Sequence, residues 1–381
     1  MQGRKIRHLS TVQRPFALNI TKAYRPTSSS ALNAVAGLLP LHIRIEEEAA
    51  RQLVKQLKRP VTFDDELFLP EDFEPQATHL HIHPSTKGRG VRIKGITTVL
   101  EQPSDITVYT DGSKIDNKVG RAFIALCPPI IIHKWQGVLR DFNSIFQSEA
   151  IAMEQTIQYL QQKQIREATI QTDSLSVLHA INNAEHSSPT IASIQQRLRE
   201  NNEQSYMLEW TKAHVGDYGN EMADSLAKDA ALGGTSGPVN IPWPISHLKK
   251  SLRLHATSKW QEEWDQGETG RRTYYHLSYV DPGRTISNPQ LIRYITGHGP
   301  FPEYFAKRGI SETDICSCGE VGTPEHYVTT CPLTTGLHIP IPQTNRQAFC
   351  KFLIKQRHFI YKLTKVMDKL SALGTDLCQT A

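Results

Sequence analysis

The chain carries four acidic residues whose positions could bring their carboxylates to one point. They are Asp111, Glu149, Asp173 and Asp224, and a histidine, His214, precedes the last of them on a glycine-containing loop. Carboxylates gathered in this way repel one another, so they destabilise a fold unless cations lie between them. Oxygen ligands of this type bind hard divalent ions, and a pair of such ions supports phosphodiester chemistry. These residues therefore predict a two-ion site for phosphodiester hydrolysis.

The elements that must position these residues are predicted between 105 and 232. Three segments rich in β-branched and aromatic residues, at 106–111, 119–126 and 130–136, are joined by short turns and predict an antiparallel meander. Helical periodicity then alternates with two further strands, at 168–172 and 207–210. We expect an α/β fold in which a mixed five-stranded sheet carries helices on both faces, flanked by mostly helical N- and C-terminal regions.

Each carboxylate falls at the end or the beginning of one of these elements. Asp111 and Asp173 end strands, and strand ends form the crevice in sheets of this kind. Glu149 lies in the first turn of the helix that crosses the sheet, and Asp224 lies in the opening turns of the last helix. One acidic residue at such a position is more often a cap than a ligand. Four of them at one sheet edge favour a shared site.

The amino-acid sequence around these residues resembles the type 1 ribonuclease H family, including the version carried by reverse-transcribing elements. The matching blocks are Tyr-Thr-Asp-Gly-Ser at 109–113, Ser-Glu-Ala at 148–150, Thr-Asp-Ser at 172–174, Trp-Thr-Lys-Ala-His-Val-Gly at 210–216 and Gly-Asn-Glu-Met-Ala-Asp at 219–224. The resemblance covers about a third of the chain. It implies the ribonuclease H fold and cleavage of the RNA strand of an RNA–DNA hybrid.

The resemblance and the chemistry together assign roles to the acidic residues. Two Mg²⁺ ions about 4 Å apart would contact the scissile phosphate, one activating a water and the other stabilising the leaving oxygen. Asp111 is expected to bridge the ions, Glu149 and Asp224 to bind one ion each, and Asp173 to hold the nucleophile side. His214 is expected to shuttle a proton or to assist product release, and its alternative is a solvated loop residue.

Recognition of the hybrid needs contacts that sense the 2′-hydroxyl of RNA. Candidate residues precede or follow the carboxylates: Gly112, Ser113, Gln147, Ser148 and Asn220. Many cellular relatives carry polar residues at the positions of Ile145 and Phe146. The sequence here therefore resembles the retroelement branch of the family more than the cellular branch. The basic helix with which some cellular relatives hold the duplex is also missing, so flanking regions would supply phosphate contacts.

Two other functions are compatible with the sequence. The chain could be a catalytically silent nucleic-acid-binding remnant, although drift would readily have replaced one of four intact carboxylates. It could also be a nuclease or integrase of related fold that acts on DNA. The Trp210 to Asp224 block argues against the second alternative, and cleavage assays on a hybrid and on a DNA duplex separate all three.

The flanking segments point to a mobile element. The text at 22–28 and 34–40 resembles the tail of a non-LTR retrotransposon reverse transcriptase, whereas an aromatic-x-Asp-Asp polymerase loop in a strand–turn–strand setting is missing from the sequence. We therefore expect the C-terminal portion of a polyprotein, or a gene derived from one, with a reverse transcriptase as partner in cis or in trans. The predicted segments are 1–60 (helical), 61–104 (irregular linker), 105–232 (ribonuclease H domain), 233–244 (linker) and 245–381 (helical, with a Cys/His cluster).

A second group of metal-binding residue types lies in the C-terminal region. Cys316, Cys318, His326 and Cys331 follow the spacing C-x-C-x7-H-x4-C, which suits tetrahedral Zn²⁺. Its role would be nucleic-acid binding or local folding, and its alternative is unligated intracellular thiols. The other cysteines, Cys127, Cys350 and Cys378, are predicted to pack. The alternating histidines at 79, 81 and 83 could bind a metal, but a strand with one polar face explains them more simply.

Bulk composition agrees with a soluble globular protein and excludes few other classes. Hydrophobic residues make up 39% of the chain, and the net charge of +5 permits a polyanionic partner without requiring one. Six cysteines are too few for a secreted disulfide framework, so a reducing, nuclear or cytoplasmic setting is expected. The sequence contains no apolar run long enough for a bilayer, so no membrane partner is expected. The basic, acid-free start imitates a mitochondrial transit peptide, but its prolines favour a basic helical surface.

Overall fold

The computed structural model describes residues 3–77, 91–94, 104–200, 203–213, 216–233 and 240–373. The chain divides into two compact units. The helical unit comprises Met1–Ala50, Phe63–Glu66 and Leu252–Ala381, and the α/β unit comprises Arg51–Thr62 and Leu67–Ser251. The N-terminal helices thus fold with the C-terminal region, although the α/β unit lies between them in the sequence. The finer division into five segments stays a prediction. Among the described helices, none has the length and apolarity to cross a membrane.

One mixed sheet forms the centre of the α/β unit. Its strands are β3 (Arg92–Ile93), β4 (Thr107–Ile115), β5 (Lys118–Cys127), β6 (Ile130–Leu139), β7 (Glu167–Thr172) and β8 (Ser205–Trp210). The strand order is β3-β8-β7-β4-β5-β6. β4, β5 and β6 form the predicted antiparallel meander, while β7 pairs parallel with β4 and β8 parallel with β7. The five predicted strands are all present, and the short β3 extends the sheet beyond β8.

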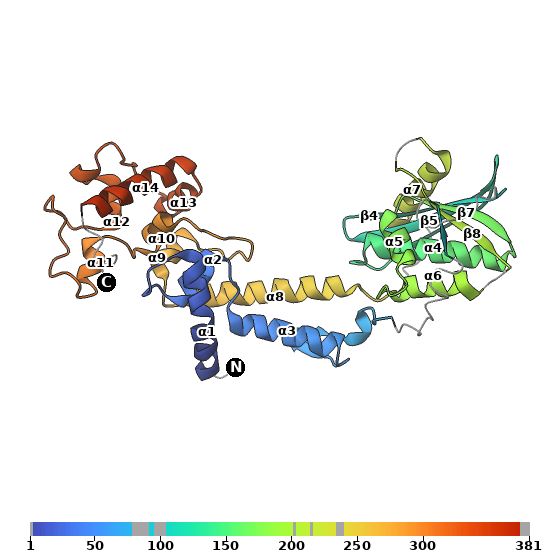
Figure 1. Cartoon of the computed structure of the whole chain (residues 1–381), viewed down its shortest axis with the longest axis horizontal. Helices are drawn as coiled ribbons and strands as arrows, with labels where there is room; N and C mark the ends of the chain where they lie inside the picture. The colour runs from blue at the N-terminus through green and yellow to red at the C-terminus, as the bar shows by residue number, and fades with distance from the viewer. Residues whose placement is uncertain are drawn as a thin grey trace. The chain divides into compact units, whose positions relative to one another are not determined.

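Helices cover both faces of this sheet, as predicted (Figure 1). They are α4 (Ile145–Gln162), α5 (Leu175–Asn182), α6 (Pro189–Glu200) and α7 (Tyr218–Ala231). Phe123 and Ala125 of β5 join the core formed with α4, α5 and α6, whereas Ile124 packs on the opposite face with Ala223 of α7. Side chains alternate between the two faces of a strand. Because both faces of β5 are covered, its sequence is apolar almost throughout instead of alternating.

A two-stranded hairpin and a 3₁₀ turn precede β3 in the sequence. β1 (Val61–Phe63) pairs with β2 (Glu66–Phe68), and the 3₁₀ turn η1 (Pro70–Asp72) follows.

The helical unit is built from short helices around an aromatic core. Its elements are α1 (Gly3–Thr21), α2 (Ser29–Ala36), α3 (Leu41–Lys55), α8 (Ile245–Gln266), α9 (Arg271–His276), α10 (Pro289–Thr296), α11 (Pro302–Ala306), α12 (Pro324–Thr329), η3 (Pro332–Thr334), α13 (Arg346–Leu353) and α14 (Arg357–Ala372), with α3 and α8 continuing into the α/β unit. Tyr294, Phe301 and Tyr327 lie in its main core. Ser28 caps the start of α2, and Gly37 ends the helix in a left-handed conformation.

Candidate functional site

Three of the four predicted carboxylates lie together at one edge of the sheet. Asp111, Glu149 and Asp173 each offer an oxygen, and these oxygens all lie within 4.8 Å of one another. The strand register explains two of the three positions. Thr110 of β4 pairs with Thr172 of β7, so the next residues, Asp111 and Asp173, occupy neighbouring positions at the same sheet edge.

A glycine lets the third carboxylate approach. A Cβ added to Gly112 would lie 2.8 Å from Oγ of Ser148 and 2.9 Å from the backbone nitrogen of Glu149. Such contacts are too short for a side chain, so the start of α4 can lie against β4 only because residue 112 is glycine. This approach brings Glu149 beside Asp111.

The two innermost carboxylates are buried without enough hydrogen-bond partners. Asp111 and Glu149 are each 5% exposed, and Oδ2 of Asp111 and Oε2 of Glu149 have no partner. Burial, followed by repulsion from Asp173 and Asp224, raises the pKa of Asp111 to about 7. Burial, followed by repulsion from Asp111 and Asp173, raises the pKa of Glu149 well above its usual value. A hydrogen bond from the Gly112 backbone opposes both increases. A cation satisfies such oxygens and removes the repulsion, so this donor set fits a hard divalent ion.

The fourth carboxylate, Asp224, has a different partner. Its Oδ2 accepts a hydrogen bond of 2.7 Å from Nζ of Lys228, one turn later in α7. Asp224 is not among the three residues with oxygens within 4.8 Å of one another, but its charge contributes to the raised pKa of Asp111. The lysine therefore compensates part of the negative charge at this edge.

The start of α7 is fixed against β4 by close packing and a cap. Asp217 accepts hydrogen bonds from the backbone nitrogens of Gly219 and Asn220, at 3.0 and 3.4 Å. A Cβ on Gly219 would lie 2.2 Å from the ring of Tyr109. Since Tyr109 precedes Asp111 by two residues, this contact sets the place of α7, and hence of Asp224, relative to β4.

Two of the predicted substrate-contacting residues, Gln147 and Ser148, are buried. Ser148 donates its hydroxyl hydrogen to the carbonyl oxygen of Gly120 and is fully buried. Gln147 is 2% exposed and donates from Nε2 to Oε1 of Glu74 (2.6 Å) and to the carbonyl oxygen of Pro242 (3.0 Å). Both side chains therefore point into the protein, which does not agree with direct substrate contact through them.

The remaining predicted site residues lie nearer to the edge or outside the described part. Ser113 is half-buried on β4 beside the crowded Gly112. Asn220 is buried, and its Oδ1 has no hydrogen-bond partner. His214 lies outside the described residues, as do the histidines at 79, 81 and 83 and Cys378. Two further residues, Lys228 and Glu74, contribute to the surroundings of the site without having been predicted from the sequence. The i, i+4 spacing from Asp224 could have revealed Lys228, but Glu74 had no local signal.

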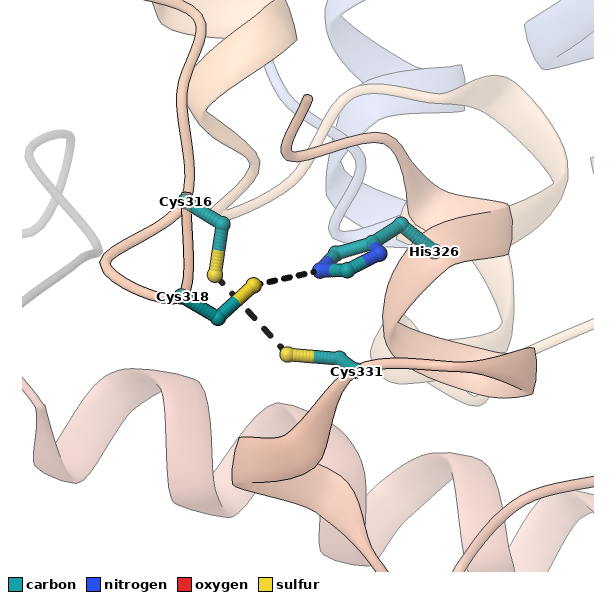
Figure 2. Close-up of side chains that lie close together, drawn as sticks. All are labelled: Cys316, Cys318, His326 and Cys331. Atoms are coloured by element: carbon teal, nitrogen blue, oxygen red, sulfur yellow. Dashed lines mark hydrogen bonds between the residues drawn. The ribbon is translucent and has the colours of Figure 1, made fainter. Parts of the chain in front are cut away.

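The Cys/His residues also come together, in the helical unit. Ligand atoms of Cys316, Cys318, His326 and Cys331 all lie within 4.8 Å of one another (Figure 2). The sulfurs of Cys316 and Cys331 are 3.8 Å apart, which matches an edge of a tetrahedron with Zn–S distances of about 2.3 Å. Sγ of Cys318 lies 3.2 Å from Nε2 of His326. The donor types and their spacing fit tetrahedral zinc.

Local structure accounts for this convergence. Gly319 takes a left-handed conformation with φ of 95° between the first two cysteines and the strand-like residue Val321, so the chain can reverse there. Thr323 caps α12 through the backbone nitrogen of His326. Nδ1 of His326 contacts Oγ1 of Thr330 at 3.2 Å, which orients the ring with Nε2 toward the sulfurs.

The other cysteines divide in their surroundings. Cys350 is buried, as its predicted packing role requires. Cys127 is exposed at the end of β5, so the packing prediction is wrong for this residue. Cys127 is the last residue of β5, and a short turn separates it from Ile130, where β6 begins.

Comparisons with known proteins agree with the fold and with the sequence blocks. The family model described as RNase H matches residues 103–232. A Pol polyprotein from the type-1 retrotransposable element R1 of Bradysia coprophila is 31% identical over 93 residues, which are 23% of this chain and 9% of that protein. A 115 kDa protein of element R1DM from Drosophila melanogaster is 35% identical over 102 residues, 24% of this chain and 10% of that protein. The chain thus matches about a tenth of the length of these relatives.

Two solved structures are each similar to about a third of the chain. RNase H1 from Halobacterium salinarum is 18% identical, with a TM-score of 0.28, and covers 33% of this chain and 96% of its own. LC11-RNase H1, solved in complex with an RNA/DNA hybrid, is 16% identical, with a TM-score of 0.29 and coverage of 33% and 96%. From the family match and the curated relatives, the chain contains an RNase H domain of the kind found in R1-type, LINE-like retrotransposon proteins.

Proposed function

We propose that the α/β unit hydrolyses the RNA strand of RNA–DNA hybrids and depends on divalent cations for this activity. The observation that carries the proposal is the pair of buried carboxylates, Asp111 and Glu149, whose unpartnered oxygens lie beside Asp173. A protein without a bound cation gains nothing from burying these charges, because their desolvation and mutual repulsion are unfavourable.

The residues at this edge of the sheet would have different roles in metal binding and proton transfer. Asp111, Glu149, Asp173 and Asp224 would together hold two Mg²⁺ ions. When bound, Mg²⁺ neutralises charge on the phosphate and lowers the pKa of a coordinated water. Gly112 keeps the first two carboxylates close together, and Lys228 holds the side chain of Asp224 near the edge. His214 is proposed to move a proton or to assist product release.

The test is cleavage of an RNA–DNA hybrid labelled on its RNA strand. The full chain should produce shortened RNA with Mg²⁺ and none with EDTA, and Asp111→Asn should lower the rate at least about a hundredfold. Asp229→Asn is the matched control, since Asp229 is an exposed residue of the same helix α7 as Asp224. Equal product from the wild type and Asp111→Asn would refute the proposal.

Two further substrates decide between the alternative functions. A DNA duplex and an RNA duplex of the same sequence should stay intact, and cleavage of the DNA duplex would favour a DNA nuclease instead. Binding of the hybrid without cleavage would favour a silent remnant. The nucleic acid is then the partner in either case, and a reverse transcriptase acting in cis or in trans would supply the hybrid.

We also propose that Cys316, Cys318, His326 and Cys331 hold Zn²⁺ in a structural role. Cys331 is fully buried, and it lies with Cys316 and Tyr327 in the main core of the helical unit. A closed set of four protein ligands leaves no position for a reacting water, which favours folding over catalysis. Purified protein should contain one zinc per chain, and Cys318→Ser, which changes the only one of the three cysteines that is not fully buried, should lose it.

A further inference from the structure

The two segments that flank the RNase H domain lie side by side in the α/β unit. Phe73 forms a parallel bridge with Trp243, and their rings are 5.8 Å apart. The backbone nitrogen of Glu74 donates to the carbonyl oxygen of Trp243 at 2.8 Å, and that of Trp243 donates to the carbonyl oxygen of Asp72 at 2.7 Å. We name residues 69–77 together with 240–247 the clasp. Both segments lie outside residues 103–232, which the family model matches.

The clasp holds the loop between β6 and α4. Nε1 of Trp243 donates to the carbonyl oxygen of Asp141 at 2.6 Å. The guanidinium of Arg140 lies 3.8 Å from the centre of the Trp243 ring, and it donates to Oδ1 of Asp72 (3.2 Å) and to Oδ1 of Asn240 (2.9 Å). One arginine thus connects both segments of the clasp with the end of the sheet strand β6.

The clasp also reaches the first turn of α4 through Gln147. Nε2 of this residue donates to Oε1 of Glu74 and to the carbonyl oxygen of Pro242. Its Oε1 accepts hydrogen bonds from the backbone nitrogen of Ser144 (3.1 Å) and from Nδ2 of Asn143 (3.0 Å). Both polar atoms of the Gln147 side chain are therefore hydrogen-bonded. Nε2 is bonded to the clasp, and Oε1 is bonded to the residues that precede α4.

These contacts bear on the site because Glu149 follows Gln147 by two residues. The Gln147 side chain and Asn143 are almost fully buried, so a lost partner there leaves a buried polar group unsatisfied. Such a network gives the helix start one preferred position. Since a misplacement of about 1 Å can lower a rate about a hundredfold, the position of the first turn of α4 matters for the Glu149 carboxylate.

We propose that the clasp is part of the catalytic unit and that Gln147 is a positioning residue, coupling the clasp to Glu149. The proposal rests on the proposed function for its effect on the rate. It replaces the substrate contact that the sequence suggested for Gln147 with an intramolecular role. It also extends the functional unit beyond residues 103–232, to the segments that supply Glu74, Pro242 and Trp243.

A charge swap in the full chain tests this coupling. Gln147→Glu keeps the oxygen that accepts from Ser144, but it loses both donors and sets a carboxylate against Glu74. Adding Glu74→Gln restores a donor–acceptor pair across the same contact. The measurements are hydrogen exchange of the backbone amides at 145–149, Mn²⁺ affinity by calorimetry, and kcat and KM on the hybrid.

Gln147→Glu should speed exchange at 145–149, weaken Mn²⁺ binding and lower kcat about tenfold, with KM changed less than about twofold. The double variant should recover to within about threefold of wild type in each measurement. A rise in KM with unchanged kcat and exchange would overturn the proposal in favour of a substrate contact. Failure of the second change to restore any of these quantities would overturn the coupling with Glu74.

A second pair of variants covers the case in which Gln147→Glu does not fold. Arg140→Met removes clasp contacts without altering α4, and Arg166→Met is its control, because Arg166 is exposed and outside the clasp. Arg140→Met alone should speed exchange at 145–149, and equal exchange in both variants would overturn the proposal. Exchange and Mn²⁺ affinity do not require turnover. If the wild type leaves the hybrid intact, the proposed function fails while these two measurements still decide whether the clasp positions α4.

Discussion

Nζ of Lys228 lies 2.7 Å from Oδ2 of Asp224, so an ammonium group borders the group of carboxylates. The charge of Lys228 also lowers the pKa of Asp111, in opposition to burial. The hydrogen bond to Asp224 raises the pKa of Lys228 itself, which keeps the ammonium charged. The lysine therefore supplies part of the compensation that a divalent cation would complete.

Removing this charge should strengthen cation binding. Lys228→Gln removes a positive charge that competes with a metal ion for the carboxylates. Calorimetric titration should therefore give an Mg²⁺ affinity about two- to fivefold higher than wild type. Lys163→Gln is the control, since Lys163 is an exposed residue at the end of α4. An equal change in both variants would mean that only the overall charge matters, and an unchanged affinity in Lys228→Gln would contradict the prediction.

Without metal, the stability of the α/β unit should fall as the pH rises toward 8. Burial raises the pKa of Asp111 from 3.8 to about 7, so the folded chain binds this proton more tightly than the unfolded chain. The stabilising contribution is complete below about pH 4 and is lost as the pH rises through about 7. Urea unfolding in EDTA between about pH 5 and about pH 8 should show this loss. The slope should be smaller in Asp111→Asn, and an identical slope would contradict the assignment.

The same residue should show opposite effects on stability and activity. Asp111→Asn removes one buried charge, so the metal-free protein should gain on the order of 1–2 kcal/mol in its free energy of unfolding. At the same time it should lose the stabilisation that Mg²⁺ gives to the wild type. Urea unfolding with and without Mg²⁺ measures both effects, and Asp229→Asn should show neither. A less stable metal-free Asp111→Asn would indicate that the carboxylate is held by contacts other than a cation.

The sequence alone predicts the five central strands of the sheet, and three of the four carboxylates that it assigns to one site lie within 4.8 Å of one another. Strand ends can be recognised from β-branched runs, and parallel pairing of β4 with β7 then places Asp111 and Asp173 together. The fold class and the RNase H resemblance are confirmed. The blocks are informative because a helix start, a strand end and a close-packed glycine each leave a local signature.

Other features depend on pairing between distant segments, which local patterns do not encode. β3 has two residues in proline-rich text, too few for a periodicity. The sequence suggested a substrate contact for Gln147 because this residue lies two positions before Glu149, whereas its side chain is buried and donates to Glu74 and Pro242. The sequence predicted two separate linkers, at 61–104 and 233–244. It did not predict the backbone hydrogen bonds that join residues 72 and 74 to residue 243.

Loss of zinc should loosen the helical unit without affecting the α/β unit. Cys316 and Cys331 lie in the core with Tyr327, so the thiolates would be buried next to apolar side chains if the metal were removed. A zinc chelator should therefore speed hydrogen exchange in α10, α12 and α14, while hybrid cleavage stays within about twofold of the untreated protein. Cys350→Ser, which changes a buried cysteine outside the group, should keep its zinc. Unchanged exchange after complete zinc removal would contradict a folding role.

Gly219 offers the sharpest test of how α7 is placed. A side chain there would collide with the Tyr109 ring, with 2.2 Å between Cβ and the nearest ring carbon. Gly219→Ala should therefore shift the start of α7, destabilise the unit by about 1–3 kcal/mol and lower the rate of hybrid cleavage, because Asp224 moves with the helix. The double variant with Tyr109→Ala makes room for the methyl group, so it should recover cleavage relative to Gly219→Ala, although the lost ring lowers stability. If Gly219→Ala cleaves as fast as wild type, the placement of Asp224 by this contact is wrong.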